Sequence, residues 1–263
     1  MAFFPFSKWH GTGNDFILVD DRAGRLPADA APLARQLCDR HFGIGSDGLI
    51  LLREAHEPGT QYHMEFLNPD GSRSFCGNGS RCAFAFRSAL LGKEEAPARF
   101  SAHDGVHEAR WLHGEVEVSM RDAAAIEELG ADLHLLHTGS PHLVVWVRDP
   151  ATVDILARAH EFRYGRRFAQ EGVNVNFVRW HAGRLEMRTY ERGVEAETLS
   201  CGTGVTAAAL SAMARGHATG ACTVSTPGGL LGVSAEKNGE GFTAIRLRGP
   251  VQEVFQGTVD LAP

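Results

Sequence analysis

The sequence predicts an α+β fold of two pseudo-symmetric halves, each a mainly antiparallel sheet wrapped around a central buried helix. Three features support this prediction: an internal repeat, alternating strand-like segments in both halves, and one apolar, small-residue segment in each half. The chain has 263 residues, of which 43% are hydrophobic. It is therefore long enough to bury one large core or two smaller ones.

Two cysteine-glycine motifs mark the repeat. Cys76-Gly-Asn-Gly-Ser-Arg recurs as Cys201-Gly-Thr-Gly-Val-Thr, 125 residues later. Thr12-Gly-Asn-Asp-Phe-Ile-Leu-Val recurs 126 residues later as Thr138-Gly-Ser-Pro-His-Leu-Val-Val. Met64-Glu-Phe-Leu-Asn-Pro-Asp-Gly precedes the first cysteine as Met187-Arg-Thr-Tyr-Glu-Arg-Gly precedes the second. Because three matches occur in the same order at nearly one offset, we expect two similar halves, roughly 1–125 and 126–263.

Alternation of apolar and polar residues predicts the strands. A period of two is typical of strands with one buried face. The alternating segments are His63–Leu67, Glu115–Met120, Val173–Trp180, Leu185–Tyr190 and Thr243–Arg248. We therefore expect strands in both halves.

One helix is predicted directly after each cysteine-glycine motif. Segments 81–91 and 205–215 contain good helix formers, and each is followed by a glycine, Gly92 or Gly216, that can form a left-handed cap. Both segments are apolar or small on nearly every face, so each helix should be buried all round. Two smaller, peripheral helices are expected at Pro32–Arg40 and Val153–His160.

Composition and charge exclude several functional classes. The 26 Lys and Arg against 32 Asp and Glu leave a net charge of −6 without the basic cluster that nucleic-acid phosphates require. The longest apolar runs, Leu143–Val147 and Leu49–Leu52, are much shorter than the roughly 20 residues of a membrane span. The N-terminus lacks the basic and apolar regions of a signal peptide. We expect a cytoplasmic protein that binds neither nucleic acid nor membrane.

Cysteine and glycine spacing also argues against disulfide, metal and nucleotide sites. The five cysteines are scattered, and the sequence contains neither Cys-x-x-Cys nor His-Glu-x-x-His. Gly43-Ile-Gly-Ser-Asp-Gly48 matches the dinucleotide-binding glycine pattern but leads from a helix-like segment into a strand, the reverse of the required context. We interpret Cys38, Cys82 and Cys222 as small core residues.

Cys76 and Cys201 differ from the other cysteines because each immediately precedes a Gly-x-Gly that opens a helix. Unpaired N–H groups and the positive end of the helix dipole lie at such a position. This setting is expected to lower the pKa of the thiol and favour the reactive thiolate. The glycines allow an anionic ligand to approach the backbone donors closely.

Two equivalent thiols suit one reaction class, in which a proton leaves one face of a carbon and another is returned to the opposite face. One cysteine would be the thiolate base and the other the thiol acid, with the roles exchanged in the reverse reaction. The amides of the two helix starts would stabilise the charge that develops on an adjacent carboxylate. Such a mechanism needs neither a metal nor a cofactor.

Together the motifs resemble diaminopimelate epimerase. The residues that carry the resemblance are His10-Gly-Thr-Gly-Asn-Asp-Phe, Gly43-Ile-Gly-Ser-Asp, Phe66-Leu-Asn-Pro-Asp-Gly, Cys76-Gly-Asn-Gly-Ser-Arg, Gly172-Val-Asn-Val, Tyr190-Glu-Arg-Gly and Cys201-Gly-Thr-Gly. The resemblance covers nearly the whole chain. It implies cofactor-independent interconversion of LL- and meso-2,6-diaminopimelate in bacterial lysine and peptidoglycan-precursor biosynthesis. It also implies that a C-terminal strand, about 253–263, returns to the first half and leaves 126–252 as the second.

The resemblance further implies roles for individual residues. Cys76 and Cys201 would be the catalytic bases, and the remaining residues would bind substrate or tune the thiols. The carboxylate at the reacting centre would be held by the backbone amides of Gly77, Asn78, Gly202 and Thr203. Other parts of the substrate would be bound by Asn14, Asn68, Asn174 and Arg192, and a substrate amine by Glu191. The thiol pKa values would be tuned by His142 and Glu191. The planar guanidinium of Arg192 suits a distal carboxylate.

Two positions depart from the pattern of the family. Gly48 stands where some members carry Gln, so that contact is expected to be absent. Ser140 stands where some members carry Asn; its hydroxyl can still form hydrogen bonds, but its substrate role is left open.

Two other functions remain as alternatives at this stage. A proline-racemase-like enzyme would share the two cysteines, but proline has no distal charged end for Arg192 and Glu191. A non-catalytic ligand-binding module would retain the anion-binding helix starts without using the thiols. The sequence leaves open the oligomeric state, for which a homodimer is the candidate, and which thiol deprotonates the LL substrate.

Overall fold

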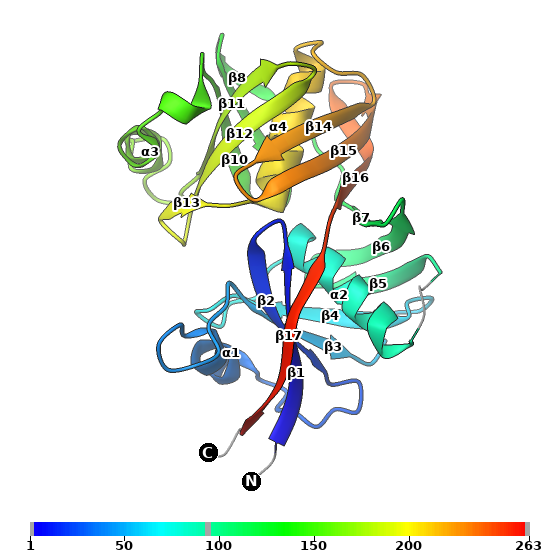
Figure 1. The fold of residues 1–263 in the computed structure, drawn as a ribbon. Coiled ribbons are helices and arrows are strands. Elements are labelled where there is room, and N and C mark those ends of the chain that lie inside the picture. Colours follow the sequence, from blue (N-terminus) through cyan, green and yellow to red (C-terminus); the bar gives the residue numbers. More distant parts are fainter. Residues whose placement is uncertain (1–2, 93–95, 261–263) are drawn as a thin grey trace. The chain divides into compact units, whose positions relative to one another are not determined.

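The computed structural model describes residues 3–92 and 96–260. The chain forms two compact units, of which the first comprises residues 1–118 with 249–263 and the second residues 119–248 (Figure 1). The last three residues of the expected C-terminal strand lie outside the described residues.

Eight strands form the sheet of the first unit. They are β1 (Phe3–Gly11), β2 (Asn14–Asp20), β3 (Leu49–Arg53), β4 (Tyr62–Leu67), β5 (Ala98–Ala102), β6 (Gly105–Leu112), β7 (Glu115–Ser119) and β17 (Gln252–Asp260). Their order is β17-β1-β2-β3-β4-β5-β6-β7. The β2–β3 and β4–β5 pairs are parallel, and the other neighbours in this order are antiparallel.

The sheet of the second unit repeats this arrangement. Its strands are β8 (Glu127–Gly130), β9 (Leu133–His137), β10 (Pro141–Trp146), β11 (Asn174–His181), β12 (Arg184–Glu191), β13 (Ala196–Thr198), β14 (Ala221–Thr226), β15 (Gly229–Asn238) and β16 (Gly241–Gly249). The order is β8-β9-β10-β11-β12-β14-β15-β16, and the short β13 pairs with the end of β12. The parallel pairs are β10–β11 and β12–β14.

Each parallel pair is joined through a helix, as parallel neighbours require a crossover connection. Helices α1 (Ala31–Cys38) and α2 (Gly77–Leu90) serve the first unit. A 3-10 turn (Pro150–Thr152), α3 (Ile155–Arg163) and α4 (Gly202–Ala214) serve the second. The same succession of strands and helices therefore occurs twice.

The second helix of each unit is surrounded by strands. Helix α2 contacts β1, β2, β3, β4 and β6, and α4 contacts β9, β10, β11, β12, β14 and β15. Nearly every residue of α4 from Gly202 to Ala212 is buried. Gly92 and Gly216 follow the helices with φ of 65° and 76°, the left-handed conformation that glycine adopts without strain. The predicted α+β class, with a mainly antiparallel sheet around one helix in each half, is confirmed.

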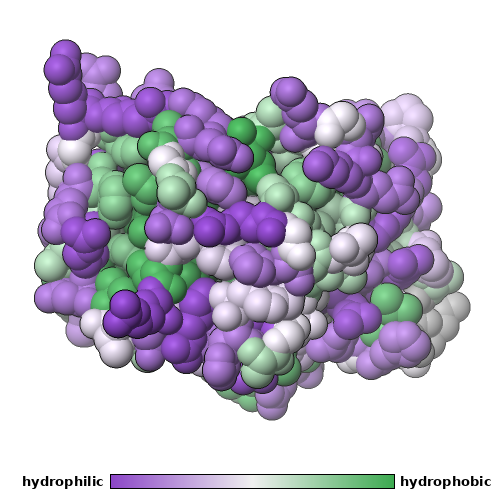
Figure 2. All heavy atoms as spheres, turned by 90° about the horizontal axis from the view of Figure 1, so that it is seen from above, coloured by the Kyte–Doolittle hydropathy of each residue, from purple (hydrophilic) through white to green (hydrophobic). Residues whose placement is uncertain are grey.

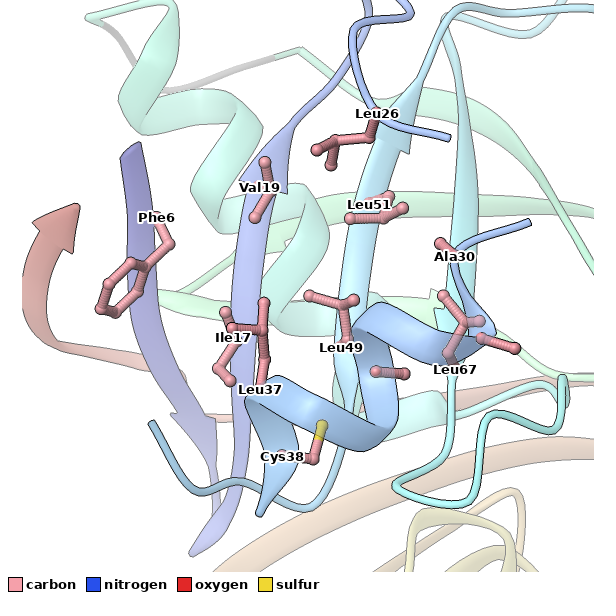
Figure 3. Packing of buried hydrophobic residues seen from close by; sticks show 12 residues of the cluster. Phe6, Ile17, Val19, Leu26, Ala30, Leu37, Cys38, Leu49, Leu51 and Leu67 are labelled. Atoms are coloured by element: carbon pink, nitrogen blue, oxygen red, sulfur yellow. The ribbon is translucent and has the colours of Figure 1, made fainter. Parts of the chain in front are cut away.

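The other two helices pack on the outer face of each sheet. In the first unit, Ile17 and Leu49 point from neighbouring strands toward Leu37 of α1 (Figure 3). In the second, α3 covers an equivalent apolar cluster that includes Val175. Helix α3 begins later than predicted because the Asp154 side chain caps it by accepting a hydrogen bond from the Ala157 N–H.

Hydrophilic residues are spread among hydrophobic ones over the face that Figure 2 shows. No helix in the described part of the chain combines the length and the apolar character that a membrane span needs.

Candidate active-site residues

Both cysteines of the repeat occupy the residue before a central helix. Cys76 has φ −133° and ψ 110° before α2, and Cys201 has φ −116° and ψ 112° before α4. This extended conformation is typical of a helix N-cap, beside N–H groups that have no acceptor within the helix. The two sulfurs therefore occupy equivalent backbone positions in the two units.

In the first unit the Cys76 sulfur lies in a network of amides. It accepts a hydrogen bond from the Gly79 N–H at 3.3 Å and lies 3.9 Å from Asn14 Oδ1. Asn78 is fully buried, and its Nδ2 donates to the same Asn14 oxygen at 3.3 Å. The structure thus brings together Cys76, Asn14 and Asn78, three of the residues predicted from the sequence.

An acidic residue that the sequence analysis did not single out orients Asn14. The Asn14 Nδ2 donates to Asp47 Oδ2 at 2.8 Å, and Arg40 donates to Asp47 Oδ1 at 2.8 Å. Because Asp47 accepts from the amide nitrogen, the amide oxygen of Asn14 faces Cys76 and Asn78. Asp47 belongs to the Gly43-Ile-Gly-Ser-Asp motif, which was the available signal.

Asn68 lies at the end of β4 and organises the loop that leads to Cys76. Its Nδ2 donates to the Ser72 carbonyl and hydroxyl at 3.1 and 3.0 Å and to Ser74 Oγ at 3.1 Å.

Gly48 packs so closely against Phe66 that a Cβ added at Gly48 would lie 2.3 Å from the Phe66 ring. The backbone at Gly48 consequently has no room for a larger side chain without rearrangement.

In the second unit the Cys201 sulfur lies next to a threonine hydroxyl, which in turn contacts a histidine. Cys201 Sγ lies 3.5 Å from Thr203 Oγ1, which in turn is 2.9 Å from His142 Nε2. Ser140 Oγ lies 2.9 Å from the same histidine nitrogen. The structure therefore connects Cys201 to Thr203, His142 and Ser140.

Asn174 extends this network toward the end of β12. Its Nδ2 donates to Ser140 Oγ and to the Pro141 carbonyl, both at 3.1 Å, and its Oδ1 accepts from the Arg192 N–H at 2.9 Å. The Arg192 side chain is exposed and donates to the Glu171 carbonyl at 2.6 Å. Glu191 accepts a hydrogen bond from the Thr198 hydroxyl.

The electrostatic setting of Cys201 differs from the sequence-based expectation. Burial raises the pKa of the Cys201 thiol well above its ordinary value, and the negative charge of Glu191 raises it further. The expectation of a lowered thiol pKa is therefore wrong for this cysteine. The helix amides and the Thr203 hydroxyl favour the thiolate, but loss of water around the sulfur has the larger effect.

His142 is fully buried and neutral at ordinary pH. Burial, followed by repulsion from His137 and Arg192, lowers the pKa of His142 to about 3. A neutral imidazole has one nitrogen that donates and one that accepts, so its hydrogen-bond partners determine which nitrogen carries the proton. Asn176, which the sequence analysis missed, lies against the second nitrogen, with its Nδ2 at 3.3 Å from His142 Nδ1.

The remaining cysteines are core residues, as predicted. Cys38, Cys82 and Cys222 are buried, and burial raises the pKa of Cys222 to about 11. Across residues 3–92 and 96–260, no three His, Cys, Asp or Glu side chains are arranged to hold a metal ion.

Comparison with known proteins identifies the family. The family model for diaminopimelate epimerase matches residues 6–126 and 134–254. The chain belongs to the diaminopimelate epimerase family. The two matched segments correspond to the two copies of the repeat.

Relatives within the diaminopimelate epimerase family align over almost the whole chain. The diaminopimelate epimerase of Flavobacterium psychrophilum is 39% identical, with 96% of this chain and 98% of the relative covered. That of Methanocella arvoryzae is 36% identical, with 99% and 98% covered.

Solved structures share the fold at lower identity. A hydroxyproline epimerase from Agrobacterium vitis superposes with a TM-score of 0.75 at 17% identity, covering 98% of this chain and 93% of its own. A Bacillus anthracis phenazine biosynthesis protein of the PhzF family gives 0.73 at 15% identity, covering 99% and 100%.

Proposed function

We propose that this protein interconverts LL- and meso-2,6-diaminopimelate by moving protons at Cα between two cysteines. The thiolate of one cysteine takes the Cα proton and becomes a thiol, leaving a carbanion whose charge spreads onto the adjacent carboxylate. The thiol of the other cysteine then returns its proton to the opposite face and becomes the thiolate. The number of protons and the total charge are unchanged by the reaction, and no electron acceptor or other co-reactant takes part.

One observation carries this proposal: two cysteines occupy the same backbone position in the two copies of a duplicated fold, each at the start of a buried helix. The N–H groups of these helix starts can stabilise carboxylate charge as it develops. The chemistry requires both thiols to reach one substrate carbon, and the amides at Gly77, Asn78, Gly202 and Thr203 would hold its carboxylate.

Membership of the diaminopimelate epimerase family supports the choice of substrate. Diaminopimelate has a second amino acid group at its far end, which needs charged and polar partners. We assign Arg192, Asn14, Asn68 and Asn174 to substrate binding and Glu191 to a substrate amine. The proposed place of the reaction is lysine and peptidoglycan-precursor biosynthesis in the bacterial cytoplasm.

Exchange of the α-proton in deuterated water tests the function. The purified full-length protein is incubated with LL-diaminopimelate or with L-proline, and deuterium incorporation and the change of configuration are measured. We expect deuterium at Cα and formation of the meso isomer with diaminopimelate, and neither with proline. Exchange with proline alone would favour the proline-racemase alternative, and exchange with neither substrate would contradict the proposed activity.

A further inference from the structure

A buried polar pair in the second unit stands where the first unit has an apolar pair. The parallel register aligns Leu143 with Val175 in the second unit as it aligns Ile17 with Leu49 in the first. Leu143 follows Ile17, and Val175 follows Leu49, by the 126-residue offset of the repeat. Counting one residue along each strand, His142 therefore corresponds to Phe16 and Asn176 to Ile50.

The glycines that open the central helices support this correspondence. A Cβ added at Gly79 would lie nearest Ile50, at 3.0 Å from its Cδ1. A Cβ added at Gly204 would lie nearest Asn176, at 2.6 Å from its Oδ1. Phe16, Ile50, His142 and Asn176 are all fully buried. Burying two polar side chains where apolar ones also fit costs free energy unless their hydrogen bonds are satisfied, so the pair in the second unit requires an explanation.

The hydrogen bonds of Asn176 fix the direction in which its amide points. Its Nδ2 lies 3.3 Å from the Leu143 carbonyl, which can only accept, so the nitrogen must be on this side. On the other side, its Oδ1 accepts from the Thr189 hydroxyl at 3.1 Å. The group that Asn176 presents to His142 Nδ1 is consequently a donor.

A donor at Nδ1 determines the tautomer of the neutral imidazole. Nδ1 must accept, so the proton resides on Nε2 and points to the hydroxyls of Thr203 and Ser140, each 2.9 Å away. When the Thr203 oxygen accepts a hydrogen bond from Nε2–H, its own hydroxyl hydrogen is available to the Cys201 sulfur at 3.5 Å. A hydrogen bond donated to sulfur stabilises the thiolate over the thiol.

We propose that Asn176 is a positioning residue that holds His142 as the Nε2–H tautomer, so that the Thr203 hydroxyl donates to Cys201 when its sulfur is negatively charged. This inference rests on the proposed function, because it assigns the network to a step in which Cys201 releases a proton. The opposite tautomer would make Nε2 an acceptor that competes with the sulfur for a hydroxyl hydrogen. Glu191 beside Cys201, and His137 and Arg192 near His142, are the charged or titratable groups facing this network.

Nitrogen NMR of the substrate-free, full-length protein tests the tautomer directly. Two-bond 15N–1H correlations distinguish Nε2–H, Nδ1–H and imidazolium rings, and a His142→Gln sample assigns the signal among the 13 histidines. We expect His142 to remain Nε2–H from about pH 6 to pH 9, because burial disfavours its charged form. An Nδ1–H or imidazolium ring in the wild-type protein would overturn the proposal, whatever any variant does.

Two substitutions then test the link to catalysis. Asn176→Leu removes the donor and keeps the branching at Cγ, and Asn176→Asp keeps the shape but presents an acceptor to Nδ1. We expect both to populate the Nδ1–H tautomer and to lower kcat by about 10- to 100-fold, the usual cost of a hydrogen bond to a charged group. KM should stay within about twofold, because Asn176 is not among the residues assigned to substrate.

Tyr190→Phe is the matched control. Tyr190 follows Thr189 on β12 but belongs to the outer apolar cluster, and its hydroxyl bonds to His160 Nε2 at 3.1 Å and to Glu195 Oε2 at 2.9 Å. The Tyr190→Phe variant loses buried hydrogen bonds in the same unit without altering the hydrogen bonds around Cys201, so kcat should not change. Folded Asn176 variants with wild-type kcat would refute the catalytic role. Absence of turnover in the wild type would instead refute the proposed function, while the NMR result still decides the tautomer.

Discussion

The helix starts at Cys76 and Cys201 have the same backbone and different surroundings. Cys76 is half-buried and accepts a hydrogen bond from the Gly79 N–H, with amide side chains beside it. Cys201 is buried, and its sulfur lies against a hydroxyl backed by a neutral histidine. The two units therefore share the backbone of the helix start, while the side chains around the sulfur differ.

The ends of the strands that precede the two cysteines show the same divergence. Asn68 at the end of β4 corresponds to Glu191 at the end of β12, and both bond to the loop that follows. One is neutral and the other is charged, so only Cys201 has a carboxylate at this place in the repeat. The charge of Glu191 raises the pKa of Cys201. The two thiols are therefore not electrostatically interchangeable, although the proposed mechanism uses both.

Removing either thiol should have the largest effect. Cys76→Ala and Cys201→Ala should each lower kcat for diaminopimelate by at least about 100-fold, because each deletes one proton carrier. Cys82→Ala and Cys222→Ala, which alter a buried cysteine in the same two units, should retain activity. A loss smaller than tenfold in Cys76→Ala or Cys201→Ala would show that this thiol is dispensable, and would contradict a mechanism that uses both cysteines.

Arg192→Ala should weaken diaminopimelate binding by about 1.5–3 kcal/mol, because a charged hydrogen bond to the distal carboxylate is lost. The corresponding position of the first unit, Pro69, carries no charge, so this effect should be confined to the second unit. KM measured for Arg192→Ala and for Arg184→Ala, an exposed arginine at the start of the same strand, makes the test. An unchanged KM in Arg192→Ala would remove this residue from the site.

Alanine substitution at Gly79 and at Gly204 should distinguish the apolar surroundings of the first helix start from the polar surroundings of the second. Gly204→Ala would bring a methyl group to 2.6 Å from Asn176 Oδ1, whose position is held by hydrogen bonds. We expect about 1–3 kcal/mol of destabilisation, typical of overpacking. Gly79→Ala meets the terminal methyl of Ile50 at 3.0 Å, which can move, so its cost should be smaller. Urea unfolding of both variants measures the difference, and equal costs would contradict the rigid Asn176 network.

The smallest effect is expected for Glu191→Gln in the substrate-free protein. Removing the negative charge should lower the pKa of Cys201, since that charge favours the protonated thiol. At pH 8 to 9 a larger fraction would then be thiolate, and alkylation of Cys201 by iodoacetamide should be several-fold faster. Mass spectrometry can follow Cys201 and Cys76 in the same sample, with Cys76 as the internal reference. A slower reaction at Cys201 would reverse the assigned sign.

The sequence alone predicts the duplication, several of the strands, the helices, and the two cysteines at helix starts. These features depend on contiguous residues: a Gly-x-Gly followed by a run of helix-forming residues predicts a helix start, and alternation marks a strand with one buried face. Only the tertiary structure revealed Asp47 and Asn176, because their functional partners, Asn14 and His142, lie 33 and 34 residues away in the chain. It also reversed the expected pKa shift of Cys201, because desolvation is set by every segment packed around the sulfur, whereas the helix dipole is a local property.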